Sequence, residues 1–409
     1  MLKVVEAFSG IGAQAKALKN IKAQFEIVNT IEWDINAILA YDVIHNGEQS
    51  SSYIDELSKE EVLQKLSKFT LSINGKEPAT KLSLSNLGEE TLKKLYKAII
   101  RTKNLVSITD VKADDLSNEI DLLTYSFPCQ DLSRGATWHG NDSGLKRDAH
   151  NRSGMLWEVE RILKEFVSEK KPLPTFLLME NVSNILSETH RSNFEEWQSY
   201  LEEIGYFNKI YTLDASNFGI PQKRVRTYML SVFCPNEKKR KKVERYFRDN
   251  DLEITSVNYP KIKKPLSSFL RTDYQNKQYK KEADDSNQND TPSRRKIYED
   301  NDVIFDKKVK IEDIKTITTK QDRNPNSGII IYKGKEGKAP YRTLTPRECF
   351  MLMGFDESDF QHLIDTNFIC RGKDFYSYGK LIKMAGNSIV VNVLEEIFKQ
   401  VIYLNDKVI

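Results

Sequence analysis

The sequence predicts an α/β protein: a mostly parallel β-sheet with helices on both faces, together with a second, smaller domain. Three observations predict this class. Apolar segments of strand length alternate with helical patterns over residues 1–235, a glycine-rich turn joins the first strand to the first helix, and reactive or charged side chains stand where strands end. Alternating strands and helices are typical of parallel sheets that are covered on both faces.

The composition supports a globular chain with room for two domains. Its 409 residues are 39% hydrophobic, and the net charge of +3 neither requires nor excludes a nucleic-acid partner. The four cysteines have no paired spacing, which argues against a zinc ribbon or a disulfide framework and favours a reducing, cytoplasmic location. No apolar stretch approaches the ~20 residues of a membrane span, and Glu6 interrupts the apolar run that a signal peptide needs. Secreted, membrane-spanning and fibrous classes are therefore excluded.

The elements of the first half follow from their apolar patterns. Apolar runs predict strands at residues 4–8, 25–31, 120–127, 175–179 and 225–233. Helical spacing predicts helices at residues 13–21, 35–44, 155–166 and 194–204. Residues of about 50–105 are rich in Ser, Lys and Glu and interrupt this rhythm, so we expect an inserted helical segment there.

The sequence changes character after residue 235. Residues 238–242 form a dense basic run. Residues 273–302 have almost no large aliphatic side chains, which predicts an exposed loop or a partly disordered segment. A helix is expected to begin at Pro346, with Thr345 as its N-cap and Glu348 as the capping-box partner. A last helix is expected after Ser388.

The glycine turn predicts a nucleotide-like ligand. Gly10, Gly12 and Ala15 satisfy the pattern G-x-G-x-x-A, and Glu32 follows Gly12 by twenty residues at the end of the next strand. Glycines let the backbone approach a ligand, and a carboxylate at that place can accept hydrogen bonds from ribose hydroxyls. Trp33 offers an aromatic face for an adenine ring. The turn alone fits NAD and S-adenosylmethionine equally well, or a plain strand-to-helix turn with a packed tryptophan.

A cysteine stands at the carboxyl end of a predicted buried strand. Pro128 cannot continue a central ladder, so the strand should stop there and present Cys129 at the sheet edge where ligands of open α/β sheets bind. The polar residues 134–152 are typical of a mobile lid. A lone cysteine, however, is more often a buried and inert side chain.

A carboxylate and two arginines are candidates for the same edge. Glu180 follows another buried strand, where burial can raise the pKa of a carboxyl group. Strand alternation places Arg224 and Arg226 on one face, where they can meet a base or an anionic backbone. Taken alone, Glu180 is equally consistent with a helix-capping acid, and a pair of arginines such as Arg224 and Arg226 more often belongs to a solvated basic turn.

Taken together and in this order, the motifs resemble the DNA (cytosine-5)-methyltransferases of bacterial restriction–modification type. The resemblance covers most of the chain and rests on Phe8-Ser9-Gly10-Ile11-Gly12, Glu32-Trp33, Ser126-Phe127-Pro128-Cys129-Gln130, Glu180-Asn181-Val182, Gln222-Lys223-Arg224-Val225-Arg226, Arg342-Thr343-Leu344-Thr345-Pro346-Arg347-Glu348-Cys349 and Gly386-Asn387-Ser388-Ile389. It implies a Rossmann-like domain that uses S-adenosylmethionine and a smaller target-recognition domain. The implied reaction is methyl transfer to C5 of a flipped-out cytosine in a specific short double-stranded DNA sequence.

The resemblance assigns the reaction to four side chains. Cys129 would add to C6 as a thiolate, Glu180 would stabilise N3, and Arg226 would hold O2 with support from Arg224. Residues of the loop after Cys129 would approach the space that the flipped base leaves: Gln130, Ser133 and Arg134.

The resemblance also assigns the cofactor contacts. Glu32 would bind the ribose and Trp33 would stack on the adenine. The full set is Phe8, Gly10, Gly12, Glu32, Trp33, Asp110, Val111, Pro128, Leu156, Asn387 and Ser388. No metal site is expected.

The expected domains are a catalytic domain at 1–234 with an insertion at about 50–105, a target-recognition domain at 235–378, and a C-terminal helix at 379–409 that completes the catalytic domain. Phosphate contacts are expected from Lys238, Lys239, Arg240, Arg294 and Arg295. We expect a monomer that binds double-stranded DNA, with no membrane partner. A cognate restriction endonuclease would act on the same site without stable binding.

Three alternatives remain. An RNA cytosine-5 methyltransferase of the same fold would have a short variable region, whereas more than a hundred residues separate Arg226 from Thr343 here. A catalytically silent DNA-binding protein would not need Cys129, Glu180 and Arg226. An NAD-dependent oxidoreductase would explain the glycine turn and none of the later motifs.

Overall fold

The computed structural model describes residues 1–128, 132, 152–305 and 311–408. The chain forms two compact units. The first, here called the sheet unit, comprises Met1–Leu213, Val225–Asn258 and Glu395–Ile409, and the second unit comprises Asp214–Arg224 and Tyr259–Leu394. The basic run at 238–242 thus belongs to the sheet unit, and the domain ranges expected from the sequence remain a prediction.

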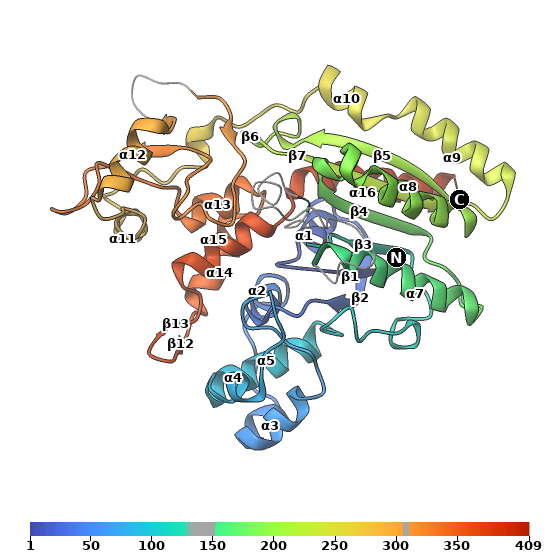
Figure 1. The fold of residues 1–409 in the computed structure, drawn as a ribbon, viewed down its shortest axis with the longest axis horizontal. Coiled ribbons are helices and arrows are strands. Elements are labelled where there is room, and N and C mark those ends of the chain that lie inside the picture. Colours follow the sequence, from blue (N-terminus) through green and yellow to red (C-terminus); the bar gives the residue numbers. More distant parts are fainter. Residues whose placement is uncertain (129–131, 133–151, 306–310, 409) are drawn as a thin grey trace. The chain divides into compact units, whose positions relative to one another are not determined.

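A six-stranded sheet with the order β2-β1-β3-β4-β7-β5 forms the centre of the sheet unit (Figure 1). Its strands are β1 (Leu2–Ala7), β2 (Phe25–Ile31), β3 (Leu122–Tyr125), β4 (Phe176–Val182), β5 (Tyr206–Asp214) and β7 (Val225–Phe233). β1, β2, β3 and β4 pair in parallel, whereas β7 pairs antiparallel with β4. The predicted mostly parallel sheet is confirmed, and the carboxyl ends of β1 to β4 share one edge with the start of β7.

Helices cover both faces of this sheet. Alternate residues such as Val5 and Ala7 enter the main apolar cluster with side chains of α7 (Leu156–Ser168) and α8 (Glu188–Glu203). Glu6 points to the opposite face, toward α1 (Ala13–Asn20) and α2 (Ile35–Asn46). The last helix, α16 (Val391–Lys407), contacts β5 through a 2.9 Å hydrogen bond from the Tyr211 hydroxyl to Gln400.

The inserted segment at about 50–105 is helical, as predicted. It contains α3 (Lys59–Leu66), α4 (Lys81–Ser85) and α5 (Glu89–Arg101). α5 buries Leu92, Leu95 and Ile99 and packs against α2 and α3. The sheet unit also holds α9 (Glu237–Asp249) and α10 (Leu252–Asn258).

The second unit combines short strands with helices. Its strand pairs are β6 (Gln222–Lys223) with β9 (Ile314–Lys315), β10 (Ile329–Ile331) with β8 (Val303–Phe305) and β11 (Tyr341–Arg342), and β12 (Ile369–Cys370) with β13 (Lys373–Asp374). Its helices are α11 (Lys277–Asp285), α12 (Pro292–Asp300), α13 (Pro346–Leu352), α14 (Glu357–Asp365) and α15 (Tyr378–Asn387). The predicted capping box of α13 is confirmed, because Thr345 and Glu348 each accept the other's backbone N–H.

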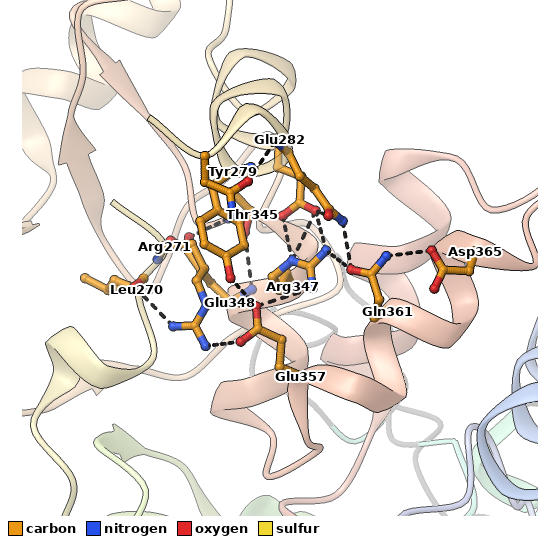
Figure 2. A network of polar contacts seen from close by, with 12 residues as sticks. Leu270, Arg271, Tyr279, Glu282, Thr345, Arg347, Glu348, Glu357, Gln361 and Asp365 are labelled. Atoms are coloured by element: carbon orange, nitrogen blue, oxygen red, sulfur yellow. Dashed lines mark hydrogen bonds and ion pairs between the residues drawn. The ribbon is translucent and has the colours of Figure 1, made fainter. Parts of the chain in front are cut away.

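The prediction of an exposed loop at 273–302 is wrong, because this segment forms α11 and α12. Polar contacts replace the missing aliphatic burial (Figure 2). Glu282 of α11 binds the guanidinium of Arg347 at 2.7 Å, and the Asn287 amide donates to two buried carbonyls, at 2.8 and 2.6 Å. Polar groups can be buried where their hydrogen bonds are satisfied, so composition alone understated the order here.

Candidate active site

The sheet registers place three sequence motifs at one edge. The aligned row of strand residues is Ala7, Ile31, Tyr125 and Met179. Phe8, Glu32 and Glu180 each follow one of these residues directly, so they lie beside one another at the carboxyl edge of the parallel strands. This edge is where ligands bind in open α/β sheets.

The glycine turn has an unusual backbone. Phe8, Gly10 and Gly12 all have left-handed φ values, of 57°, 55° and 78°. A side chain in this region costs roughly 1–2 kcal/mol, which glycine avoids and Phe8 does not. The Gly10 N–H donates to Oε2 of Glu32 at 2.9 Å, so the first and second predicted cofactor motifs are in direct contact.

Glu32 is fixed on both its side chain and its backbone. Its Oε1 accepts the N–H of Asp34 at 2.8 Å, while Asn104 bonds to the Glu32 N–H and carbonyl at 3.1 and 3.0 Å. Burial raises the pKa of Glu32 to about 7, and the Asp34 charge adds to the increase while hydrogen bonds from Asp34 and Gly10 oppose it. Sequence reasoning missed Asn104, because nothing local connects it to a residue 72 positions away.

The other predicted cofactor residues divide between the two units. Val111 and Leu156 belong to the main apolar cluster, and Phe8 packs against it. Arg161 of α7 donates to the carbonyl of Val111 at 2.8 Å and fixes that segment, whereas the side chain of Asp110 is exposed. For the remaining residues, cofactor binding stays a prediction. Trp33 and Pro128 belong to the sheet unit, and Asn387 and Ser388 belong to the second unit.

Glu180 and Arg226 form an ion pair. Antiparallel pairing of β4 with β7 sets Val182 opposite Arg226, and Nε of Arg226 lies 3.4 Å from Oε1 of Glu180. Both side chains are largely buried, with 12% exposure for Glu180 and 16% for Arg226. The sequence named both residues, and the antiparallel register explains why they meet.

Cys129 lies outside the described residues, as do Gln130, Ser133 and Arg134, while the residues that flank 129–131 are well anchored. The Asn181 amide donates to the Phe127 carbonyl at 3.1 Å, and the Asn184 amide donates to the Leu132 carbonyl at 2.7 Å. Both asparagines follow Glu180 closely. Sequence reasoning quoted Asn181 within a motif and gave neither residue a role.

Arg224 does not share the partner of Arg226. Its guanidinium is buried and donates to the carbonyls of Ile317, Gly386 and Ser388 at 2.9, 3.1 and 2.8 Å. The expectation of one shared face assumed a continuous strand, but β6 ends at Lys223 and β7 begins at Val225. Arg224 therefore organises backbone within the second unit.

The predicted phosphate contacts lie on two helices. Because β7 is antiparallel, α9 begins at the sheet edge opposite Glu180, and the Arg240 guanidinium lies 5.6 Å from the ring centroid of Phe207. On α12, Arg294 donates to the Arg323 carbonyl at 3.1 Å, and Arg295 binds Asp290 through two bonds of 2.9 and 2.8 Å. Lys238 and Lys239 also lie on α9, and the role of all five in DNA binding stays a prediction.

Within the described ranges, no group of His, Cys, Asp and Glu side chains is arranged to hold a metal ion. Their helices also include none with the length and apolarity that crossing a membrane requires.

The open sheet, the left-handed glycine turn and the carboxylate that binds it define a Rossmann-like α/β fold with a turn of the kind that binds nucleotide-like ligands. The family model for C-5 cytosine-specific DNA methylase matches residues 66–403. This protein belongs to that family.

Two curated relatives match nearly end to end. The orphan methyltransferase M.SssI of Spiroplasma monobiae is 34% identical over 410 residues, covering 98% of this chain and 97% of its own. The type II methyltransferase M2.ScrFI of Lactococcus lactis subsp. cremoris is 32% identical over 403 residues, covering 98% and 99%. Among solved structures, the S. pombe Dnmt2 methyltransferase is similar in fold, with a TM-score of 0.61, 17% identity and coverage of 99% and 100%.

Proposed function

We propose that this protein transfers a methyl group from S-adenosylmethionine to C5 of a cytosine flipped out of a short, specific double-stranded DNA sequence, with Cys129 as the nucleophile. The observation that carries the proposal is the Glu180–Arg226 ion pair, with 3.4 Å between Nε and Oε1, at the edge that also holds the glycine turn. An acid and a guanidinium side by side can bind two neighbouring polar atoms of one pyrimidine ring.

The cofactor fits the residues present. The Glu32 carboxylate accepts the backbone N–H groups of Gly10 and Asp34 and can also accept a ribose hydroxyl, and the open space beside Gly10 lets a ligand approach the backbone. Phe8, Trp33, Val111 and Leu156 would supply apolar contacts. When bound, S-adenosylmethionine supplies an electrophilic methyl group.

The chain's own residues would overcome the low reactivity of cytosine C5. Addition of the Cys129 thiolate to C6 places negative charge on the ring, which makes C5 nucleophilic. Glu180 would give N3 a proton as the negative charge develops there and would accept a hydrogen bond from the exocyclic amine, and Arg226 would donate to O2. Once C5 carries the methyl group, a base removes the remaining C5 proton, the thiolate leaves C6, N3 returns its proton, and the aromatic ring is restored. The cytosine must leave the stack first, at a cost of about a few kcal/mol.

The relatives' names suggest the setting. M2.ScrFI is a type II methyltransferase, and this name supports protection of DNA against a restriction endonuclease that acts on the same sequence, whereas M.SssI is an orphan methyltransferase. We propose a cytoplasmic monomer that binds the duplex and forms no stable complex with that endonuclease.

Covalent trapping tests the proposal. Duplex DNA that carries 5-fluorocytosine at the target should form a complex stable in denaturing gels with wild-type protein and S-adenosylmethionine, because fluorine cannot leave as a cation. Cys129→Ser should abolish the complex and methyl transfer, and Glu180→Gln should slow trapping by roughly 10²-fold while S-adenosylmethionine affinity is kept.

Cys370→Ser is the matched control, since this partly exposed thiol lies in the second unit and outside the proposed site. An adduct that persists in Cys129→Ser, or methylation by wild type without any trapping, would overturn the mechanism. Trapping on RNA and not on DNA would show that the substrate is RNA.

A further inference from the structure

The side chain of His45, in α2, contacts the backbone of the glycine turn. Nε2 of His45 lies 3.0 Å from the carbonyl oxygen of Ile11. Burial lowers the pKa of His45 to about 4, so the ring is neutral near pH 7. A carbonyl only accepts, so the neutral ring carries its hydrogen on Nε2 and donates it to Ile11.

Gly12 lets the turn approach this helix closely. A Cβ at Gly12 would lie 2.2 Å from Nε2 of His45 and 2.7 Å from Cε2 of Tyr41. The two rings contact each other, with centroids 4.5 Å apart. We call this pair, Tyr41 and His45, the α2 shelf. The backbone of the turn packs against these two rings at Gly12, and the Cβ of any other residue type there would collide with them.

The turn is therefore held from two directions. Glu32 binds the Gly10 N–H from the β2 side, and His45 binds the Ile11 carbonyl from the α2 side. A non-glycine residue in the left-handed region persists only where the surrounding structure fixes it, and Phe8 is such a residue. The two side-chain bonds fix the turn together with its backbone bonds, from the Gly12 N–H to the Ser9 carbonyl at 2.9 Å and from the Ser9 N–H to the Ile31 carbonyl at 3.3 Å.

We propose that His45 is a positioning residue for the cofactor: through the Ile11 carbonyl it holds the glycine turn in the shape that S-adenosylmethionine binds. The inference rests on the proposed function and adds to it a residue 34 positions away from its partner. His45 itself contacts the backbone of the turn.

Calorimetric titration of the full chain with S-adenosylmethionine tests this role. His45→Leu keeps much of the volume and removes the donor, and it should weaken cofactor binding about three- to tenfold, the loss expected for one hydrogen bond. His45→Gln places an amide N–H near the position of Nε2 and should stay within about twofold of wild type. Asn46→Ala is the matched control, because its amide binds Asp42 on the same helix at 2.9 Å and not the turn.

A double-mutant cycle tests the close contact independently. Gly12→Ala should weaken cofactor binding strongly in the wild-type background and less in His45→Ala, where the 2.2 Å clash with the imidazole is gone while the 2.7 Å contact with Tyr41 and the positive φ of 78° remain. Additive losses would overturn the close contact between Gly12 and His45. Thermal unfolding without cofactor separates positioning from stability, because a merely structural role would lower the melting temperature of His45→Leu and leave the affinity of the folded protein unchanged.

The outcomes distinguish the two levels of inference. Wild-type affinity in His45→Leu, or equal losses in His45→Leu and His45→Gln, would overturn the role of His45 alone. A wild-type chain that binds no S-adenosylmethionine would overturn the proposed function and this inference with it.

Discussion

Glu6 is a residue of β1 whose carboxyl group is completely buried on one face of the sheet. It faces α1 and α2, where burial raises its pKa to about 7, while the Tyr41 hydroxyl and the Ala15 backbone N–H oppose the increase. The ordinary value of 4.5 applies in the unfolded chain, so folding makes this group hold its proton more tightly. The consequence is a pH dependence of stability whose direction is opposite to that of a salt-bridged acid.

We predict that the Glu6 contribution to stability is fully present below pH 4.5 and is lost as the pH rises to about 7. The difference between the two pKa values corresponds to about 3 kcal/mol of unfolding free energy. Urea unfolding at several pH values should therefore show wild type losing stability relative to Glu6→Gln over this interval and running parallel to it above pH 7. Since His45 titrates in both proteins, its effect cancels. Parallel curves across the whole interval would contradict the prediction.

Individual residues of the candidate site differ in how far the sequence predicts them. Gly10 and Glu32 were predicted because their spacing is characteristic, and the 2.9 Å contact between them confirms that they meet. Asn104 and His45 were not, because their contacts join residues 72 and 34 positions apart through backbone atoms, which carry no residue-specific pattern. Side-chain chemistry is visible in a sequence; the support of a loop by a distant amide or imidazole is not.

At the scale of elements, α15 depends on one glycine and not on another. A Cβ at Gly386 would lie 2.4 Å from the Thr319 nitrogen and 2.5 Å from the Thr318 carbonyl carbon, both backbone atoms that cannot rotate away. A Cβ at Gly379, in the first turn of the same helix, would meet only Asp322 at 4.0 Å. The carbonyl of Gly386 is also one of the three that Arg224 binds.

We predict that Gly386→Ala lowers the unfolding free energy by about 2 kcal/mol or more, because the added methyl group must separate α15 from the threonine segment. Gly379→Ala should be neutral or stabilise by up to about 1 kcal/mol, because alanine favours a helix over glycine. Chemical unfolding followed by circular dichroism provides the comparison. Equal effects of the two substitutions would show that the backbone of Thr318 and Thr319 does not pack closely against Gly386.

Elements were predicted well where apolar side chains define them and poorly where polar ones do. The strands predicted at 25–31 and 225–233 match β2 and β7 residue for residue. The small number of large aliphatic side chains in residues 273–302 predicts no helix where α11 and α12 form. Their order comes instead from bonds such as those of Glu282 and Asn287 to partners more than 50 residues away, which no local pattern reveals.

At the scale of the whole molecule, the chain passes between the two units four times, at 213/214, 224/225, 258/259 and 394/395. The motif Gln222-Lys223-Arg224-Val225-Arg226 contains one of these crossings, so Arg224 serves the second unit while Arg226 pairs with Glu180 in the sheet unit. A single continuous motif thus supplies two units, which explains why its two arginines have different partners.

The second unit has its own charged core. Arg342 and Glu348 form a fully buried ion pair with bonds of 2.8 Å, and Arg347 binds Glu282 and Gln361 within the network of Figure 2. Both partners of such a pair are needed, because removing either one would leave the charge of the other buried without compensation.

We therefore predict that Glu348→Gln destabilises the second unit by about 3–5 kcal/mol, because it leaves the Arg342 charge buried without its partner. Hydrogen exchange read by mass spectrometry should locate the loss: amides of α13 and α14 should exchange faster, while those of β1, β3 and β4 should keep their protection. Glu237→Gln is the control, since its ion pair with Lys241 is 3.6 Å long and largely exposed, and it should change exchange nowhere. Faster exchange throughout the sheet unit as well would mean that the two units unfold as one, and unchanged exchange in α13 and α14 would mean that the buried pair does not hold the second unit together.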